Sequence, residues 1–234
     1  MLLVSAGSNA QGQLATGDCE DAHVFTNCCF QDCEPGRLPA GVNNFVQIAF
    51  GSNHTLVLLD GVQDASSSPK RELWGSGDGS KYQLGLSVNT STPIFVPIEL
   101  GLATLGLRDY TIKTIAACWE TSYVVLSHPE QGDVLLSMGS DDFGDLGIGG
   151  LAKSSGHAKP IHRVEFTPDC LGTEDVSSVR VHSLRAGSHH VIAQLSVEYP
   201  DKTVRERLVG WGTSRHGQLG THRWQVVHVL GIRR

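Results

Sequence analysis

The chain has 234 residues and a net charge of −6, and 40% of its residues are hydrophobic. It is long enough to bury a substantial core, but it lacks the long basic stretch that charge-driven binding to DNA or RNA requires. Its longest apolar stretches, such as residues 55–59, are far shorter than the ~20 residues that span a bilayer. We therefore expect no nucleic-acid partner, no membrane partner, and a cytoplasmic or nuclear location.

A glycine-rich phrase, AGSNAQGQLA, stands at residues 6–15 and recurs three times further along the chain. MGSDDFGDLG (138–147) and WGTSRHGQLG (211–220) keep its pattern, and GDGSKYQLG (77–85) has Tyr82 where the others have Gly. In every copy a Gly precedes a Leu by seven positions. These pairs are Gly7 and Leu14, Gly77 and Leu84, Gly139 and Leu146, and Gly212 and Leu219, and the middle glycines are Gly12, Gly144 and Gly217.

A cluster of cysteines follows the first copy of this phrase. Cys29 and Cys33 have the spacing of one pair of zinc ligands, but Cys28 adjoins Cys29 and Cys19 is isolated. A structural zinc site normally uses two such pairs. We therefore expect reduced thiols in a loop between strands of the first repeat, with no bound metal.

A second phrase alternates with the first, as QIAFGSNHTLVLL, TIAACWETSYVVL and SLRAGSHHVIAQL, starting at residues 47, 114 and 183. Each copy has apolar residues on both sides of a tight turn, which predicts a β-hairpin. In the first copy we expect strands over 46–50 and 55–59 with a bend at 51–53. The columns shared between copies hold Gly51, Cys118 and Gly187, and also His54 and His190. A His that recurs in such a hairpin more often bonds a backbone group than a metal.

Short strands, such as residues 73–76 and 134–138, lead into the glycine-rich phrases. Their glycines indicate a loop that needs positive φ, and the Leu at its end is expected to anchor the loop on the core. The prolines of TPIFVPIEL (92–100) indicate an edge strand. The segments 60–71 and 149–160 are rich in Ser, Gly and Lys and are expected to be flexible loops.

Each period of the two phrases therefore holds about four short strands, which is the sequence signature of a β-propeller blade. We predict an all-β fold in which residues 1–234 form a single partial β-propeller of about three and a half blades.

The pattern W-G-x-x-x-x-G-Q-L-G, following G-x-x-H-x-x-x-L, resembles the repeat of the regulator-of-chromosome-condensation (RCC) superfamily. Members of this superfamily form seven-bladed propellers, so the resemblance implies an incomplete arc of such a ring. Either the chain is a fragment or it closes with another half, and the first reading is favoured. Such an arc is expected to be poorly soluble, with Val226, Val227, Val229 and Leu230 lacking a sheet partner.

The phrase IAACWETSYVVL is similar to that of the fungal alpha-tubulin suppressor, or killer-toxin-insensitivity, branch, although that branch prefers Gly where this chain has Cys118. This resemblance implies a small CSL-type metal protein as the partner. It also implies a role in regulating diphthamide synthesis and Elongator-dependent tRNA wobble-uridine modification. The alternative is guanine-nucleotide exchange on a Ran-like small GTPase.

No nucleophilic triad, H-E-x-x-H motif or phosphate loop is present in the sequence, so we expect neither an enzyme nor a cofactor. An enzyme with its site in the propeller channel is a further class, for which no residues can be named. Asp141, Asp142 and Asp145 are expected to be solvated acids of a turn. Trp119 and Glu120 depart from the other hairpin copies and form either a binding hot spot or, for the Trp, a cap on the neighbouring blade.

Overall fold

The computed structural model describes residues 2–61, 71–86, 88–149, 160–171, 175–220 and 228–230. The two predicted flexible loops, 60–71 and 149–160, lie almost entirely outside these ranges. Within them, the regular structure consists of strands and one four-residue helix, α1 (Pro168–Leu171). No helix in this part of the chain has the length and apolar character needed to cross a membrane.

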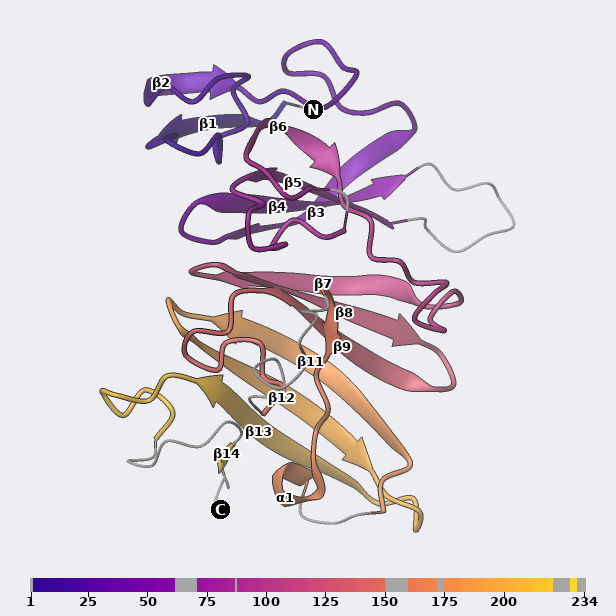
Figure 1. Ribbon diagram of the computed structural model, residues 1–234. Coiled ribbons are helices and arrows are strands. Elements are labelled where there is room, and N and C mark those ends of the chain that lie inside the picture. Colours follow the sequence, from indigo (N-terminus) through magenta and orange to yellow (C-terminus); the bar gives the residue numbers. More distant parts are fainter. Residues whose placement is uncertain are drawn as a thin grey trace.

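The strands form four antiparallel sheets that follow one another in chain order (Figure 1). The first sheet pairs β1 (Val4–Gly7) with β2 (Ala22–Asn27). The second contains β3 (Val42–Phe50), β4 (His54–Gly61), β5 (Arg71–Gly77) and β6 (Thr92–Pro97). The third contains β7 (Thr111–Cys118), β8 (Thr121–His128), β9 (Gly132–Gly139) and β10 (His162–Arg163). The fourth contains β11 (Ser178–Ala186), β12 (His190–Glu198), β13 (Val204–Gly212) and β14 (His228–Leu230).

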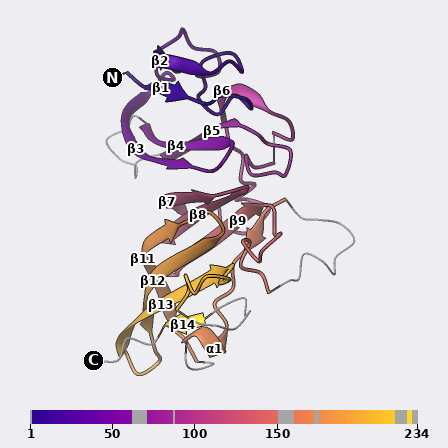
Figure 2. The same ribbon diagram turned by 90° about the vertical axis from the view of Figure 1, so that its left-hand side faces the viewer.

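Each four-stranded sheet has its strands side by side in sequence order, which is the form of a propeller blade. The sheets stack face to face along the molecule (Figures 1 and 2). The protein is therefore an all-β structure of propeller blades, as the repeats predicted. The described residues build three blades and one two-stranded sheet.

The second strand of a blade contributes apolar side chains to two cores, one on each face of its sheet. In β4, Leu56 and Leu58 belong to the core between the second and third sheets, whereas Val57 and Leu59 belong to the core beneath the first sheet. Because successive side chains point to opposite faces, a strand between two neighbouring sheets must be apolar at every position. This explains the uninterrupted TLVLL run in β4, and β8 is divided between two cores in the same way.

The predicted hairpins and edge strand are confirmed. β3 and β4 pair across a bend at residues 51–53, and β6 forms the edge of its sheet. The expectation for the terminal segment was wrong at two of its four positions, because Val229 and Leu230 pair with β13. The open edge of β13 offers free N–H and C=O groups, so even a three-residue strand can bind to it. Residues 226 and 227 lie outside the described ranges.

Polar side chains connect neighbouring blades. The Gln47 amide donates to the Ile115 carbonyl at 2.6 Å and accepts the Ile115 N–H at 3.0 Å, which adds a backbone-like link between β3 and β7. Asp133 makes the corresponding link from the third sheet to the fourth. Its fully buried carboxylate lies 2.7 Å from the Lys113 Nζ and 3.4 Å from the Arg180 Nη1, and accepts the Val181 N–H at 2.8 Å.

The Asp133→Ala substitution should lower the free energy of unfolding by about 2–3 kcal/mol, somewhat less than for a fully buried pair, because Lys113 and Arg180 can each turn toward solvent. Burial by itself raises the pKa of Asp133, but the Lys113 and Val181 hydrogen bonds outweigh it and hold the pKa below its usual value. The stabilisation is therefore present above the unfolded-state pKa and is lost as the pH falls through the folded-state pKa. Urea denaturation of both proteins at pH 7 and at pH 3 tests this. Equal losses at both pH values would contradict it, and Asp142→Asn, at an exposed loop acid, is the control.

Candidate functional site

The four glycine-rich loops have the same backbone conformation. The glycines that open them, Gly7, Gly77, Gly139 and Gly212, have φ values of 127°, 96°, 124° and 95°. The middle position is left-handed in every copy, at Gly12, Gly144, Gly217 and also at Tyr82, whose φ is 65°. Tyr82 therefore adopts the glycine conformation although it is not glycine, and the predicted need for positive φ is confirmed.

The Leu that ends each loop is buried in three of the four copies. Leu84, Leu146 and Leu219 are at most 2% exposed, as expected of an anchor on the core. Leu14 is only half-buried, and this departs from the prediction. The first sheet has two strands in the described residues, so Leu14 lacks the pair of strands that covers its counterparts.

The hairpin His bonds a side chain rather than the predicted backbone group. His54 is buried, and its Nε2 lies 2.8 Å from the hydroxyl of Ser122 in the next blade. Burial lowers the pKa of His54 to about 4, so the ring is neutral at pH 7. In the corresponding position, His190 is only half-buried, and burial lowers its pKa as well.

The same hairpin explains why Cys118 can replace glycine. A Cβ placed on Gly51 or Gly187 would lie within 2.3 Å of the His54 or His190 ring. The third sheet has the smaller Thr121 in the His column, so the turn between β7 and β8 has room for the Cys118 side chain.

The tips of the three hairpins form a chain of backbone hydrogen bonds that runs from blade to blade. The Ser52 N–H donates to the Trp119 carbonyl at 2.9 Å, and the Trp119 N–H donates to the Ser188 carbonyl at 2.9 Å. Trp119 therefore lies at the centre of this row, and its side chain is 48% exposed. Glu120 follows it on the same tip and is half-buried.

Four side chains meet beside this tip, and two of them, Trp119 and Asp145, differ from a residue that all the other copies share. Trp119 replaces the Ser of the other hairpins, and His189 occupies the column of Asn53 and Glu120. Phe143 and Asp145 lie in the loop after β9. The other loops have Gln11, Lys81 and His216 in the Phe143 column, and Gln13, Gln83 and Gln218 in the Asp145 column. We call Trp119, Phe143, Asp145 and His189 the tip cluster.

Ring contacts hold the tip cluster together. The His189 ring lies between two aromatic rings, with its centroid 5.3 Å from that of Trp119 and 4.5 Å from that of Phe143. The Arg215 guanidinium lies 5.1 Å from the Phe143 centroid, in a cation–π contact. The cluster thus joins three segments from two blades, and Trp119 is its most exposed member.

Asp145 is the buried member of the tip cluster, and the pKa of its carboxyl is raised. It is 3% exposed, and its Oδ2 lies 3.7 Å from the His189 Nδ1. Burial raises the pKa of Asp145 to about 6, although His189 favours the charged carboxylate and opposes the shift. Its backbone carbonyl accepts hydrogen bonds from the Tyr123 hydroxyl at 2.6 Å and the Trp211 Nε1 at 2.9 Å. The expectation that Asp145 is a solvated turn acid was wrong, because Asp145 is buried, as Gln83 is at the same loop position.

The Asp145→Gln substitution should stabilise the fold by about 1–2 kcal/mol at pH 8. In all three other loops the Gln side chain accepts the N–H two residues earlier, from Gln11 to Gln13, Lys81 to Gln83 and His216 to Gln218. A carboxylate with a raised folded-state pKa becomes less favourable to folding as the pH rises from its unfolded value of 3.8 to about 6, and its contribution is constant above that.

The advantage of the Gln variant should therefore grow between pH 4 and pH 6 and then level off, as measured by urea denaturation. Asp142→Asn, at an exposed acid of the same loop, is the control. A variant that is less stable than the natural protein at pH 8 would contradict this account of Asp145.

Of the tip cluster, the prediction from sequence identified only Trp119, with Glu120 beside it. Phe143 and His189 were missed because each is an ordinary loop or turn residue when its copy is read alone. The signal that could have found them is the comparison of columns between the copies, combined with the contact between neighbouring hairpin tips.

Cys28, Cys29 and Cys33 lie in the loop between β2 and β3, as predicted from the sequence. Burial raises the pKa of Cys28 and of Cys29, which disfavours the reactive thiolate form. Cys28 packs in the core beneath the first sheet. In the described part of the chain, no three His, Cys, Asp or Glu side chains are grouped as metal ligands would be.

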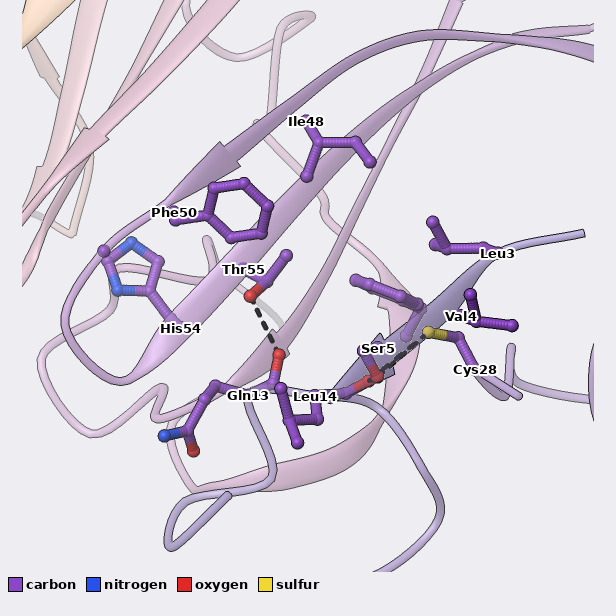
Figure 3. A pocket seen from close by; sticks show the side chains of 12 residues that line it. Leu3, Val4, Ser5, Gln13, Leu14, Cys28, Ile48, Phe50, His54 and Thr55 are labelled. Atoms are coloured by element: carbon purple, nitrogen blue, oxygen red, sulfur yellow. Dashed lines mark hydrogen bonds between the residues drawn. The ribbon is translucent and has the colours of Figure 1, made fainter. Parts of the chain in front are cut away.

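A pocket of about 170 Å³ lies between the first sheet and the tip of the β3–β4 hairpin (Figure 3). Apolar side chains such as Leu3, Ile48 and Phe50 line it, and the Thr55 hydroxyl donates to the Gln13 carbonyl at its floor. The pocket adjoins the free edge of β1, where the other sheets have two further strands. Ser5, Cys28 and His54 also line it, but Ser5 and Cys28 bond the Leu14 carbonyl and the His54 Nε2 bonds Ser122, so no nucleophile is seen paired with a base among these described residues.

Comparisons with known proteins agree with the repeat. Residues 5–58 match the model of the regulator of chromosome condensation (RCC1) repeat family. The chain is 27% identical over 222 residues to the ultraviolet-B receptor UVR8 of Arabidopsis thaliana, an alignment that covers 94% of this chain and 39% of that protein. A crystal structure of human WBSCR16 is similar with a TM-score of 0.49 and 16% identity, over 96% of this chain and 65% of that one. The chain thus spans about two fifths of the length of UVR8, and the repeat match and this relative support an RCC-like repeat protein.

Proposed function

We propose that the chain is a non-catalytic, protein-binding regulatory module that engages its partner through the tip cluster and Glu120. The observation that carries this proposal is that two departures from the repeat, Trp119 and Asp145, meet the rings of Phe143 and His189 at one exposed place. Repeat positions that serve only the fold should look alike in every copy, and most of them do. An exposed Trp119, and a buried Asp145 carboxylate whose partner, the His189 Nδ1, lies at 3.7 Å, have no evident benefit for the fold, so a binding role accounts for them better.

The composition of the site fits protein recognition. Aromatic residues and Arg are enriched where binding energy concentrates, and Trp119 and Arg215 supply both types at one surface. The tip is also held by backbone hydrogen bonds on both sides of Trp119, so little ordering entropy would be lost on binding.

The specific partner that we propose is a small CSL-type metal protein. The support for it is the resemblance of the phrase around Trp119 and Glu120 to the alpha-tubulin suppressor branch, since these two residues lie in the exposed tip. Through this partner, the module would regulate diphthamide synthesis and Elongator-dependent tRNA wobble-uridine modification in the cytoplasm or nucleus.

The test is a titration of the CSL-type protein from the same organism into the full chain, followed by calorimetry. We expect binding at micromolar concentrations that Trp119→Ala weakens at least about tenfold, as is usual for a central aromatic anchor. Phe25→Ala is the matched control, because Phe25 is an aromatic residue that is 79% exposed on the first sheet, away from the tip.

Absence of binding at these concentrations would overturn the proposed partner. Accelerated nucleotide release from a Ran-type GTPase by the chain would instead support the exchange-factor alternative. If Trp119→Ala and Phe25→Ala weaken binding of the CSL-type protein equally, the tip cluster is not its binding site.

A further inference from the structure

Three of the four buried polar atoms that lack a hydrogen bond in the described residues lie at the tip cluster or on its neighbour. They are the Asp145 Oδ1, the His189 Nδ1 and the Thr213 Oγ1. These residues adjoin one another, since Asp145 and His189 face each other at 3.7 Å and the Thr213 N–H donates to the His189 carbonyl at 2.7 Å. Buried polar groups are ordinarily hydrogen-bonded; the His189 Nδ1 and the Thr213 Oγ1 can donate or accept, whereas the Asp145 Oδ1 of the ionised carboxylate can only accept and so lacks a donor.

The charge around the cluster selects the kind of partner. Glu120 follows Trp119 on the hairpin tip, and Asp141 and Asp142 precede Phe143 in its loop, where the Asp141 carboxylate accepts the Leu146 N–H at 3.0 Å. Asp145 adds a fourth carboxylate, which is buried, and its unpaired Oδ1 is an acceptor that only a donor can satisfy. An anionic ligand would meet repulsion from these groups, whereas a cation would be attracted.

One ring of the tip cluster already contacts a cationic side chain of this chain. Arg215 lies over Phe143 in a cation–π contact, which shows that a guanidinium is compatible with this surface. Trp119 contacts the His189 ring and still has 48% of its surface exposed, so it retains area for a second cation. Trp is the aromatic side chain that binds cations most strongly.

We propose that the tip cluster receives a lysine or arginine side chain from a protein partner, with the cation between the Trp119 ring and the carboxylates of Glu120 and Asp145. This inference rests on the proposed function, because it specifies the chemistry by which the tip cluster recognises its partner. The cation supplies the N–H donor that the Asp145 Oδ1 lacks and lies against an aromatic face.

The probe for this inference is a seven-residue peptide, Gly-Ser-Gly-Arg-Gly-Ser-Gly, with both ends blocked. Two matched peptides replace its arginine with citrulline, which keeps the shape and removes the charge, or with glutamate. Binding to the full chain is followed by fluorine NMR of 5-fluorotryptophan, with the Trp119 signal assigned by its loss in Trp119→Phe.

We expect the arginine peptide to shift the Trp119 signal saturably, and the citrulline peptide to bind at least about tenfold more weakly. Asp145→Gln and Glu120→Gln should each weaken binding of the arginine peptide about threefold to fivefold. Asp201→Asn should leave binding unchanged, because Asp201 lies in the turn at the opposite end of the fourth sheet. Circular dichroism and thermal melting confirm that each variant is folded, and Glu120→Gln, at the surface, covers the case in which Asp145→Gln does not fold.

Equal binding of the arginine and citrulline peptides would overturn the inference, and so would tighter binding of the glutamate peptide. An equal loss in Asp201→Asn would show attraction to the net charge of the chain alone and would also overturn it. The outcomes separate the two proposals. If the CSL-type protein binds and neither Glu120→Gln nor Asp145→Gln weakens that binding, the proposed function is supported and the inference is overturned. If the arginine peptide binds and the CSL-type protein does not, the inference is supported and the proposed partner is overturned.

Discussion

The Gly139→Ala substitution should destabilise the protein by about 3–6 kcal/mol, whereas Gly7→Ala should cost about 1–3 kcal/mol. Both glycines open a repeat loop, with φ values of 124° and 127°, so alanine is strained to the same degree at each. The surroundings differ. A Cβ on Gly139 would lie 2.1 Å from the Glu120 carbonyl oxygen, whereas a Cβ on Gly7 would meet nothing within 4 Å.

Urea denaturation of both variants at pH 7 measures this difference. We expect the Gly139 variant to lose at least about 2 kcal/mol more than the Gly7 variant, because the hairpin backbone cannot move away from the added methyl group. Equal losses would show that strain alone decides the cost, and that the contact between hairpin and loop is not the reason for glycine in this column.

The Trp211→Ala substitution should destabilise the protein by about 3–5 kcal/mol, the usual cost of removing a fully buried aromatic side chain. Trp211 is 0% exposed, packs edge-on against Tyr123 with centroids 5.9 Å apart, and donates to the Asp145 carbonyl. It therefore connects the core between the third and fourth sheets with the floor of the tip cluster.

Trp119→Ala is the matched control for this experiment, because it removes the same side chain from an exposed place. It should change the free energy of unfolding by less than about 1 kcal/mol. Chemical denaturation of both variants at pH 7, followed by circular dichroism, distinguishes them. A Trp119→Ala variant as unstable as Trp211→Ala would show that Trp119 is chiefly a structural cap, the alternative that the sequence left open.

Much of the fold follows from local patterns that repeat. The hairpin phrases predicted β3–β4, β7–β8 and β11–β12 because a glycine turn between apolar runs has few other solutions. The glycine-rich phrase predicted loops with positive φ for the same reason. These features depend on residues close in sequence, so one chain is enough to predict them.

Contacts between blades were harder to predict. The His54 ring bonds Ser122, which lies in the next blade, and no local pattern indicates such a partner. Asp145 reads as a turn acid in its own loop, and only the packing of the fourth sheet against that loop buries it. The half-buried Leu14 likewise depends on how many strands its sheet contains. The candidate site was therefore only partly predictable, since it is formed by the tips of two blades.

The central claim is that the departures from the repeat serve binding rather than folding. The most direct test is one variant in which each tip-cluster residue is replaced by the residue at the same position of another copy in this chain. Its substitutions are Trp119→Ser, Phe143→Gln, Asp145→Gln and His189→Asn. We measure its thermal melting and its binding of the arginine peptide. The account predicts a melting temperature within a few degrees of the natural protein's and at least about a tenfold loss of binding. A variant that unfolds, or one that binds the peptide as tightly as the natural protein, would contradict it.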